Sequence, residues 1–123
     1  MKAIKILLVD NNNQFRNSAV NFINNNVKFE LISWASSSEE AVNKILVNSF
    51  DLAILDLNMN GLNGLETTKK IRSFNKDIKI IITTFNNNPE YKEQCLAVGA
   101  NDFIPKQNFA EQLIPSINKI FYN

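Results

Sequence analysis

Polar residues that could bind a metal ion and accept a phosphoryl group follow several short apolar segments of this chain. Asp10 and Asn11 come after the first segment, Asp56 and Asn58 after the third, and Lys106 after the fifth. Neighbouring carboxylates raise each other's pKa unless a cation joins them, and oxygen ligands of this kind suit Mg²⁺ or Mn²⁺. These residue types therefore predict an acidic pocket that binds a divalent cation.

The same residues include the groups that phosphoryl transfer requires. A carboxylate such as Asp56 can accept a phosphoryl group as an acyl phosphate, provided that cations offset the charge on the phosphoryl oxygens. Lys106 would be one of these cations. The Thr84 hydroxyl would donate a hydrogen bond to a phosphoryl oxygen, while the Asp56 carboxylate and the Asn58 backbone carbonyl bind the metal. An isolated aspartate after a strand is more often a loop or cap residue, so it is the joint placement that favours this function.

The apolar segments have the length and composition of strands that are buried on both faces. They cover Ile4 to Val9, Phe29 to Trp34, Leu52 to Leu55 and Ile78 to Ile82, with a weaker one at Asp102 to Ile104. Between them, apolar residues recur at the spacing of one helix face. Five strands that alternate with five helices predict an α/β fold with a doubly wound parallel sheet, in which ligands bind beyond the carboxyl ends of the strands.

Helix starts are expected between the strands. The serines before Glu39 can cap a helix whose first turn is acidic, and Pro89 is suited to the first turn of another helix. A last helix is predicted near the C-terminus, from Phe109 to Phe121. Pro115 lies inside this pattern, where it would either kink the helix or mark its start.

The composition is that of one globular domain. The chain has 123 residues, of which 45% are hydrophobic and 20% are charged, and we assign residues 1–123 to one domain with no further domain in this chain. The net charge of +1 disfavours direct nucleic-acid binding. Cys95 is the single cysteine, and no apolar run reaches the ~20 residues of a membrane span, so a cytoplasmic protein is expected.

From about Lys5 to Asn118 the chain resembles the receiver domain of two-component response regulators, a chemotaxis-regulator-like family. The segment from Asp56 to Gly64 is similar to the family's acceptor-aspartate segment. The resemblance implies a flavodoxin-like (βα)₅ fold with strand order 2-1-3-4-5. It also implies that Asp56 is the phosphoacceptor, Asp10 an acidic-pocket residue, Lys106 the phosphate-binding lysine and Phe103 the aromatic switch residue.

Ungapped spacing from Asp56 and from Gly99 places the family's switch hydroxyl at Thr84, although one inserted residue would place it at Thr83. On phosphorylation Thr84 is expected to move inward and Phe103 to turn toward the space that it leaves, which would remodel the face formed by the fourth helix, fifth strand and fifth helix. Without the resemblance, Phe103 would equally suit a core position in a strand.

The chain departs from the family pattern at four positions. Asn11 replaces a second acidic metal ligand, Asn60 stands where proline is usual, Phe85 replaces a small residue, and Gln107 replaces a proline found in many members. Asn11 matters most, because an amide oxygen can bind Mg²⁺ but brings no charge. We therefore expect a weak metal site that still permits phosphorylation.

The resemblance implies a sensor histidine kinase or a phosphotransfer protein as phosphodonor, and a downstream protein or a separate output domain as target. A homodimer linked to phosphorylation is also compatible with it. Phe15-Arg16 and Thr84-Phe85 resemble the subgroup that carries a helix-turn-helix output domain, so either the receiver acts alone or such a domain has been removed. A degenerate receiver that binds partners without phosphorylation remains an alternative. A flavodoxin-like ligand binder is a weaker one, because no glycine-rich loop follows the first strand.

Overall fold

Strands and helices alternate along the chain. The computed structural model describes residues 2–59, 61–86 and 88–122, so Asn60 of the acceptor segment lies outside the described residues. The strands are β1 (Ile4–Val9), β2 (Phe29–Ala35), β3 (Leu52–Asp56), β4 (Lys79–Thr84) and β5 (Asp102–Pro105). The helices are α1 (Asn13–Asn24), α2 (Ser38–Val47), α3 (Gly64–Phe74), α4 (Pro89–Ala97) and α5 (Phe109–Phe121), with a 3₁₀ turn (Lys106–Asn108) before α5.

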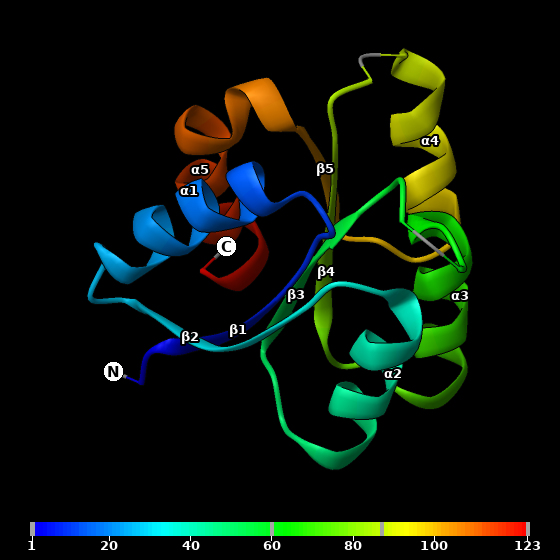
Figure 1. Ribbon diagram of the computed structural model, residues 1–123, viewed down its shortest axis with the longest axis horizontal. Coiled ribbons are helices and arrows are strands. Elements are labelled where there is room, and N and C mark those ends of the chain that lie inside the picture. The colour runs from blue at the N-terminus through cyan, green and yellow to red at the C-terminus, as the bar shows by residue number, and fades with distance from the viewer. Residues whose placement is uncertain (1, 60, 87, 123) are drawn as a thin grey trace.

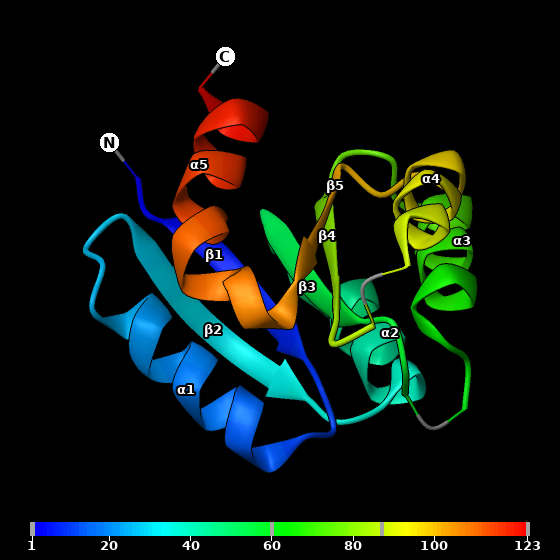
Figure 2. The same cartoon turned by 90° about the horizontal axis from the view of Figure 1, so that it is seen from above.

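The strands form one parallel sheet in the order β2-β1-β3-β4-β5. Helices α1 and α5 cover one face of this sheet, and α2, α3 and α4 cover the other (Figures 1 and 2). This arrangement confirms the predicted doubly wound α/β fold and its strand order. It follows from the right-handed crossovers that join parallel strands through helices.

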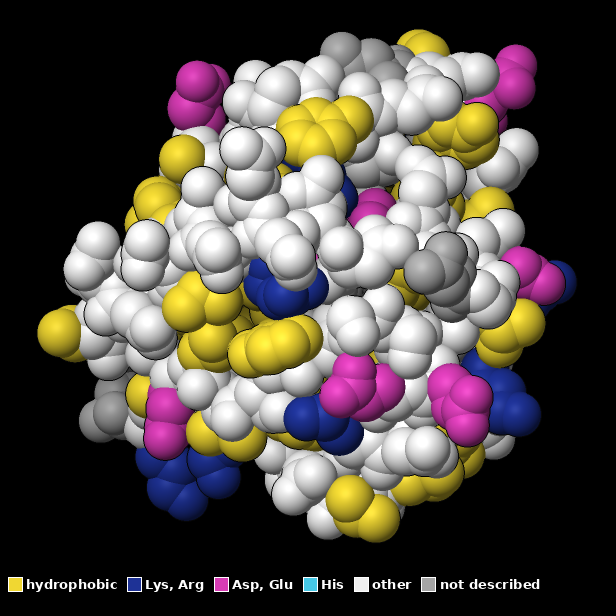
Figure 3. All heavy atoms as spheres, in the orientation of Figure 1, with side chains coloured by type: hydrophobic (Ala, Val, Ile, Leu, Met, Phe, Trp, Pro, Cys, Tyr) yellow, Lys and Arg dark blue, Asp and Glu magenta, His cyan; other side chains and the backbone are white. Residues whose placement is uncertain are grey.

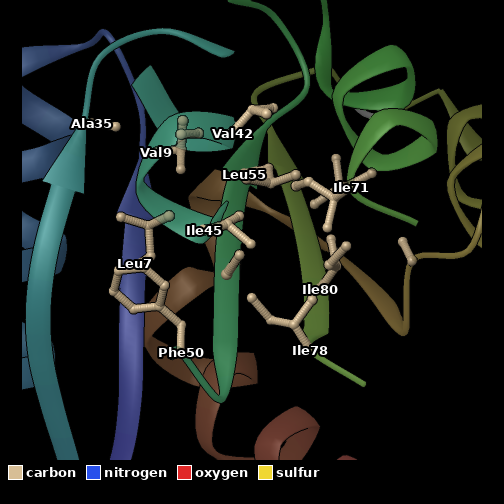
Figure 4. Packing of buried hydrophobic residues seen from close by; sticks show 14 of the residues in the cluster. Leu7, Val9, Ala35, Val42, Ile45, Phe50, Leu55, Ile71, Ile78 and Ile80 are labelled. Carbon is tan, nitrogen blue, oxygen red and sulfur yellow. The ribbon is translucent and has the colours of Figure 1, made fainter. Parts of the chain in front are cut away.

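The core has one layer on each face of the sheet, which explains why the strand segments are continuously apolar. On one face, Leu7 and Leu55 point toward the residues of α2 and α3, including Ile45 and Ile71 (Figure 4). On the other face, alternate residues of the same strands such as Leu8 pack with α1 and α5. Successive side chains of a strand point to opposite faces, so both alternating sets are apolar here.

Two predicted helix starts are confirmed by capping contacts. The Ser37 hydroxyl accepts a hydrogen bond from the Glu40 backbone N–H at 3.2 Å and caps α2. Pro89 is the first residue of α4, and the Asn88 side chain caps that helix by accepting from the Glu90 N–H at 3.0 Å. Both caps satisfy backbone donors that the first helical turn leaves unpaired.

The last helix corrects one interpretation of Pro115. Helix α5 begins at Phe109 and continues through Pro115, so this proline does not mark the start of the helix. Leu113 and Ile117 are buried against the sheet on either side of the proline. Packing of this apolar face therefore stabilises the helix although a proline removes one backbone hydrogen bond.

The surface has no dominant charge in the view of Figure 3. Acidic and basic side chains are scattered there among neutral and hydrophobic ones, without a broad basic area on the described part of that face. Within the described ranges, no helix combines the length and the apolar character needed to cross a bilayer.

Candidate functional site

The residues that the sequence singled out lie at one edge of the sheet. Asp10 follows β1, Asp56 ends β3, Thr84 ends β4 and Lys106 follows β5, and all four are buried. The strands are parallel, so their carboxyl ends share one edge of the sheet. Parallel strand order thus brings together side chains that are far apart in the sequence.

Lys106 joins the two carboxylates of the pocket. Its ammonium nitrogen Nζ lies 2.7 Å from Asp10 Oδ2 and 3.4 Å from Asp56 Oδ2. The side chains of these residues are between 1% and 5% exposed, so little water screens the ion pairs. One positive charge therefore faces two negative charges in a buried site.

The Asp10 carboxylate is only partly satisfied. Its Oδ1 accepts a hydrogen bond from the Asn12 backbone N–H at 2.8 Å. Its Oδ2 is buried and makes no hydrogen bond to the described residues, so Lys106 meets this oxygen through charge attraction rather than through an aligned hydrogen bond. Such an oxygen is suited to a cation.

The carboxyl of Asp56 resists ionisation. Burial is the largest cause that raises its pKa from 3.8 to about 6, and the charge of Asp10 acts in the same direction. The Lys106 ammonium and the Asn58 N–H, which donates to Asp56 Oδ1 at 3.2 Å, oppose this rise. One ammonium group therefore does not compensate fully for two buried carboxylates, and additional positive charge is favoured here.

This imbalance predicts that Asp56→Asn stabilises the metal-free protein near neutral pH. The folded protein binds the Asp56 proton more tightly than the unfolded chain does, so stability from this group is present below the unfolded pKa of 3.8 and is lost as pH rises toward about 6. Above that range the variant should be more stable by about 1–3 kcal/mol. Urea denaturation in chelator at pH 4 and pH 7.5 measures the effect, and an equal difference at both values would contradict it.

Thr84, and not Thr83, has its hydroxyl next to the acceptor segment. Thr84 Oγ1 accepts hydrogen bonds from Asn58 Nδ2 and from the Asn86 backbone N–H, each at 3.1 Å. The Thr83 hydroxyl instead donates to the Leu55 carbonyl at 3.4 Å inside the sheet. Adjacent residues of a strand point to opposite faces, so only one of the two threonines can lie on the side of Asn58.

Gly64 allows the acceptor segment to fold back over the end of β3. A Cβ atom at this position would lie 2.8 Å from the Asp56 carbonyl oxygen and from Leu57 Cα, which are backbone atoms. The Gly64 N–H donates to the Leu57 carbonyl at 2.8 Å. Asn63 and Glu66 then form a capping box at the start of α3. The spacing between Asp56 and Gly64 therefore has a steric cause.

The pocket around Lys106 contains the carboxylates of Asp10 and Asp56, and Asn11 stands where the family has a further acidic residue. Within the described part of the chain, no group of three or more acidic, cysteine or histidine side chains is placed to hold a metal ion. Asn11 is exposed at the start of the β1–α1 loop. Asn12 is the N-cap of α1, and its side chain accepts from the Phe15 N–H at 2.9 Å. Asn11 is therefore the amide of this loop that is not committed to the helix cap.

Phe103 lies in β5, where it pairs with Ile82 of the neighbouring strand β4. It is 8% exposed and belongs to the core layer that contacts α2, α3 and α4. Its side chain also lines a surface groove with Lys92 of α4 and Gln112 of α5. A change in its position would therefore be transmitted to the surface formed by α4, β5 and α5.

Arg16 of α1 contacts the β1–α1 loop in a way that the sequence did not predict. Arg16 Nη1 donates to the Asp10 carbonyl at 2.7 Å, and Nη2 donates to Asn13 Oδ1 at 2.5 Å. The guanidinium lies 4.0 Å from the ring centroid of Trp34 in β2, a cation–π contact. In the sequence Arg16 was noted only as part of the Phe15-Arg16 pair that resembles one subgroup of the family, because the cation–π contact depends on a residue of another element.

Comparison with known proteins identifies the family. Residues 6–118 match the model of the response regulator receiver domain, which is most of the chain. The chain belongs to this family. It is therefore a receiver domain of the kind found in two-component systems, and the resemblance noted in the acceptor segment is confirmed.

Curated relatives are longer than this chain. A protein-glutamate methylesterase/protein-glutamine glutaminase of Clostridium acetobutylicum is 34% identical over 108 residues, which are 86% of this chain and 31% of that protein. A nitrate/nitrite response regulator protein homolog of Haemophilus influenzae is 31% identical over 117 residues, which are 95% of this chain and 56% of the relative. The receiver thus spans about half or less of these relatives.

Solved structures agree with the fold. A DNA-binding response regulator of the LuxR family from Staphylococcus aureus superposes with a TM-score of 0.87 at 27% identity, covering 95% of this chain and 98% of that one. A two-component response regulator of the same family from Aurantimonas sp. SI85-9A1 has a TM-score of 0.90 at 23% identity, covering 97% and 85%. Both comparisons place the receiver fold over nearly the whole chain.

Proposed function

We propose that this receiver accepts a phosphoryl group on Asp56 in a reaction that requires a divalent cation. The observation that carries the proposal is the buried arrangement of Lys106 between Asp10 and Asp56. An ammonium held at this position would neutralise charge on the phosphoryl oxygens during transfer. A degenerate receiver would have no need for two buried carboxylates whose charges are incompletely compensated.

The chain's own groups can carry out the transfer. A carboxylate oxygen of Asp56 forms the new bond to phosphorus, the bond from phosphorus to the donor's leaving atom breaks, and the leaving group departs with that electron pair. Lys106 orients and stabilises the phosphoryl oxygens, and Thr84 donates a hydrogen bond to one of them. The protein then acts as a phosphoacceptor in signalling, and its only catalysis is directed at itself.

The residues of the pocket suit Mg²⁺ or Mn²⁺. Asp10, Asp56 and the Asn58 backbone carbonyl would bind the ion, with the Asn11 amide as an uncharged additional ligand. The buried Asp10 Oδ2 without a hydrogen bond to the described residues fits this assignment. When bound, the ion supplies positive charge to the phosphoryl oxygens.

Phosphorylation would switch the protein by drawing the Thr84 hydroxyl inward as a donor to a phosphoryl oxygen. In the structure the hydroxyl oxygen accepts hydrogen bonds from Asn58 and Asn86. The inward movement would lengthen these contacts and open space for Phe103, which changes the surface of α4, β5 and α5. Phe103 has no hydroxyl that could form a hydrogen bond in either position. The free-energy difference between the two states would therefore be smaller than in a receiver with tyrosine at this position.

The partners follow from this role. The donor would be a sensor histidine kinase or a phosphotransfer protein, and the switched face would bind a downstream protein, an output domain or a second receiver. The direct test is incubation with acetyl phosphate in Mg²⁺ and in chelator, followed by intact-mass measurement. Gain of one phosphoryl group in Mg²⁺ alone supports the proposal. A protein that never gains this mass over a range of donors and metals would be a degenerate receiver.

Asn11→Asp is expected to tighten Mg²⁺ binding about tenfold, because it adds a negative charge at bonding distance from the ion and even strong screening leaves roughly 1.4 kcal/mol. The fluorescence of Trp34, the single tryptophan, can report the titration, since Arg16 links its ring to the Asp10 carbonyl. Wild-type phosphorylation should then need higher Mg²⁺ than the variant. The control is Asn12→Asp, which adds the same charge at the helix cap. Equal affinities of wild type and Asn11→Asp would show that Asn11 is not a ligand.

A further inference from the structure

The Lys106 ammonium contacts two aromatic rings in addition to the carboxylates. Its Nζ lies 4.6 Å from the ring centroid of Phe15 and 5.1 Å from that of Phe85. Both distances are in the range of cation–π contacts. Phe15 comes from α1 and Phe85 directly follows β4, so the rings come from two separate parts of the chain.

The two rings are anchored differently. Phe15 packs edge-to-face against the buried ring of Phe109, with centroids 5.2 Å apart, and is thereby fixed to the core of α1 and α5. Phe85 is 58% exposed, and its ring forms an edge-to-face pair with Phe15 at 6.1 Å and contacts the Lys106 ammonium. A half-exposed phenylalanine contributes little core packing. The position of Phe85 is thus accounted for mainly by what it covers.

We propose that Phe85 is a positioning residue that covers the phosphoryl site and prolongs the life of phosphorylated Asp56. The inference rests on the proposed function of Asp56. Hydrolysis of the acyl phosphate requires a water oxygen to bond to phosphorus while the bond from phosphorus to the Asp56 oxygen breaks. The water gives up a proton to solvent, inorganic phosphate leaves, and the Asp56 oxygen keeps the electron pair of the broken bond as a carboxylate. A ring over Lys106 restricts the approach of that water and holds the ammonium on the phosphoryl oxygens.

The cover also explains the low exposure of a charged side chain at the protein surface. The Lys106 side chain is 3% exposed although it follows the last strand in a surface turn. The carboxylates of Asp10 and Asp56 contact the ammonium, and the rings of Phe15 and Phe85 lie at cation–π distance from it. Removing the exposed ring is the change that opens the ammonium to solvent without disturbing the carboxylates.

Phe85→Ala and Phe85→Tyr test the inference together with Phe74→Ala. Phe74 ends α3, is 40% exposed and provides the same truncation away from the pocket. After phosphorylation by acetyl phosphate and removal of the donor, loss of phosphoryl mass is followed over time. Phe85→Ala should lose it roughly two- to fivefold faster than wild type, the range for losing one partly exposed cation–π contact. Phe85→Tyr keeps the ring and should match wild type, as should Phe74→Ala.

A second measurement does not depend on phosphorylation. Brief reaction with an amine-acylating reagent, followed by peptide mass spectrometry, reports the access of solvent to Lys106, with the exposed Lys28 as internal reference. Phe85→Ala should raise labelling of Lys106 relative to Lys28, and Phe85→Tyr should not. Unchanged labelling and unchanged loss of phosphate in Phe85→Ala would overturn the inference, and so would increased labelling without faster loss. A wild-type protein that is never phosphorylated would instead refute the proposed function, while the labelling still tests the cover.

Discussion

Asp56→Asn is expected to abolish phosphorylation of this receiver. The asparagine side chain keeps the size and much of the hydrogen bonding of aspartate, but its amide cannot form the acyl phosphate that a carboxylate forms. In acetyl phosphate and Mg²⁺ the wild type should gain one phosphoryl group by intact mass, and the variant should gain none. The contrast is between presence and absence of a covalent product, so it is the largest effect that the structure predicts.

Two controls make this result specific. Asp77→Asn makes the same substitution at an exposed residue after α3, and it should leave phosphorylation unchanged. The expected stabilisation of Asp56→Asn in chelator separates a lost acceptor from a misfolded protein, because a misfolded variant would be less stable. If the variant still gained phosphate at the wild-type rate, the acceptor would be another residue and the assignment of Asp56 would be wrong.

The fold and the central pocket could be predicted from the sequence for a simple geometric reason. Parallel strands that are buried on both faces appear in the sequence as short apolar segments. The residues that follow these segments lie at one edge of the sheet. Asp10, Asp56 and Lys106 could therefore be placed together without any knowledge of their side-chain conformations. The ion pairs at 2.7 and 3.4 Å are the expected outcome of that placement.

Contacts between side chains of different elements could not be predicted in this way. The cation–π contact of Arg16 with Trp34 depends on how α1 is oriented against the edge strand β2. The cover of Lys106 by Phe15 and Phe85 depends on the path of the loop after β4. In the sequence Phe85 was visible as a departure from the family pattern and as part of a pair that resembles one subgroup, but its contacts with Lys106 and Phe15 were not.

Local rules also failed where tertiary packing was stronger. Pro115 was expected either to kink the last helix or to mark its start, and the second alternative is wrong because α5 begins at Phe109 and is stabilised by burial of Leu113 and Ile117. Ungapped spacing favoured Thr84 over Thr83, but one inserted residue would have reversed this choice. The two hydroxyls are separated by the alternation of β4, which directs one into the sheet and the other to Asn58. The structure therefore supports Thr84 as the hydroxyl available to a phosphoryl group.

Lys106→Met should slow phosphorylation of Asp56 by about a hundredfold or more, the usual cost of removing one preorganised donor that stabilises charge in a transition state. Methionine keeps much of the length and apolar stem of lysine, so the rings of Phe15 and Phe85 retain a neighbour. The rate of phosphoryl gain at saturating Mg²⁺ measures the effect. Lys79→Met makes the same change at the start of β4, away from the pocket, and should keep the wild-type rate.

The same variant should change metal affinity in the opposite direction. In the wild type, the Lys106 ammonium contacts the Asp10 Oδ2 atom to which a divalent cation would bind. The ammonium and the metal ion would therefore compete for one buried oxygen. Without that competitor, Mg²⁺ should bind more tightly to Lys106→Met, while the metal-free protein loses stability because two buried carboxylates have lost their partner. Added Mg²⁺ should restore much of this stability. Slower transfer combined with tighter Mg²⁺ binding distinguishes a lysine that acts on the phosphoryl group from one that merely maintains the fold, because a general loss of structure would weaken both.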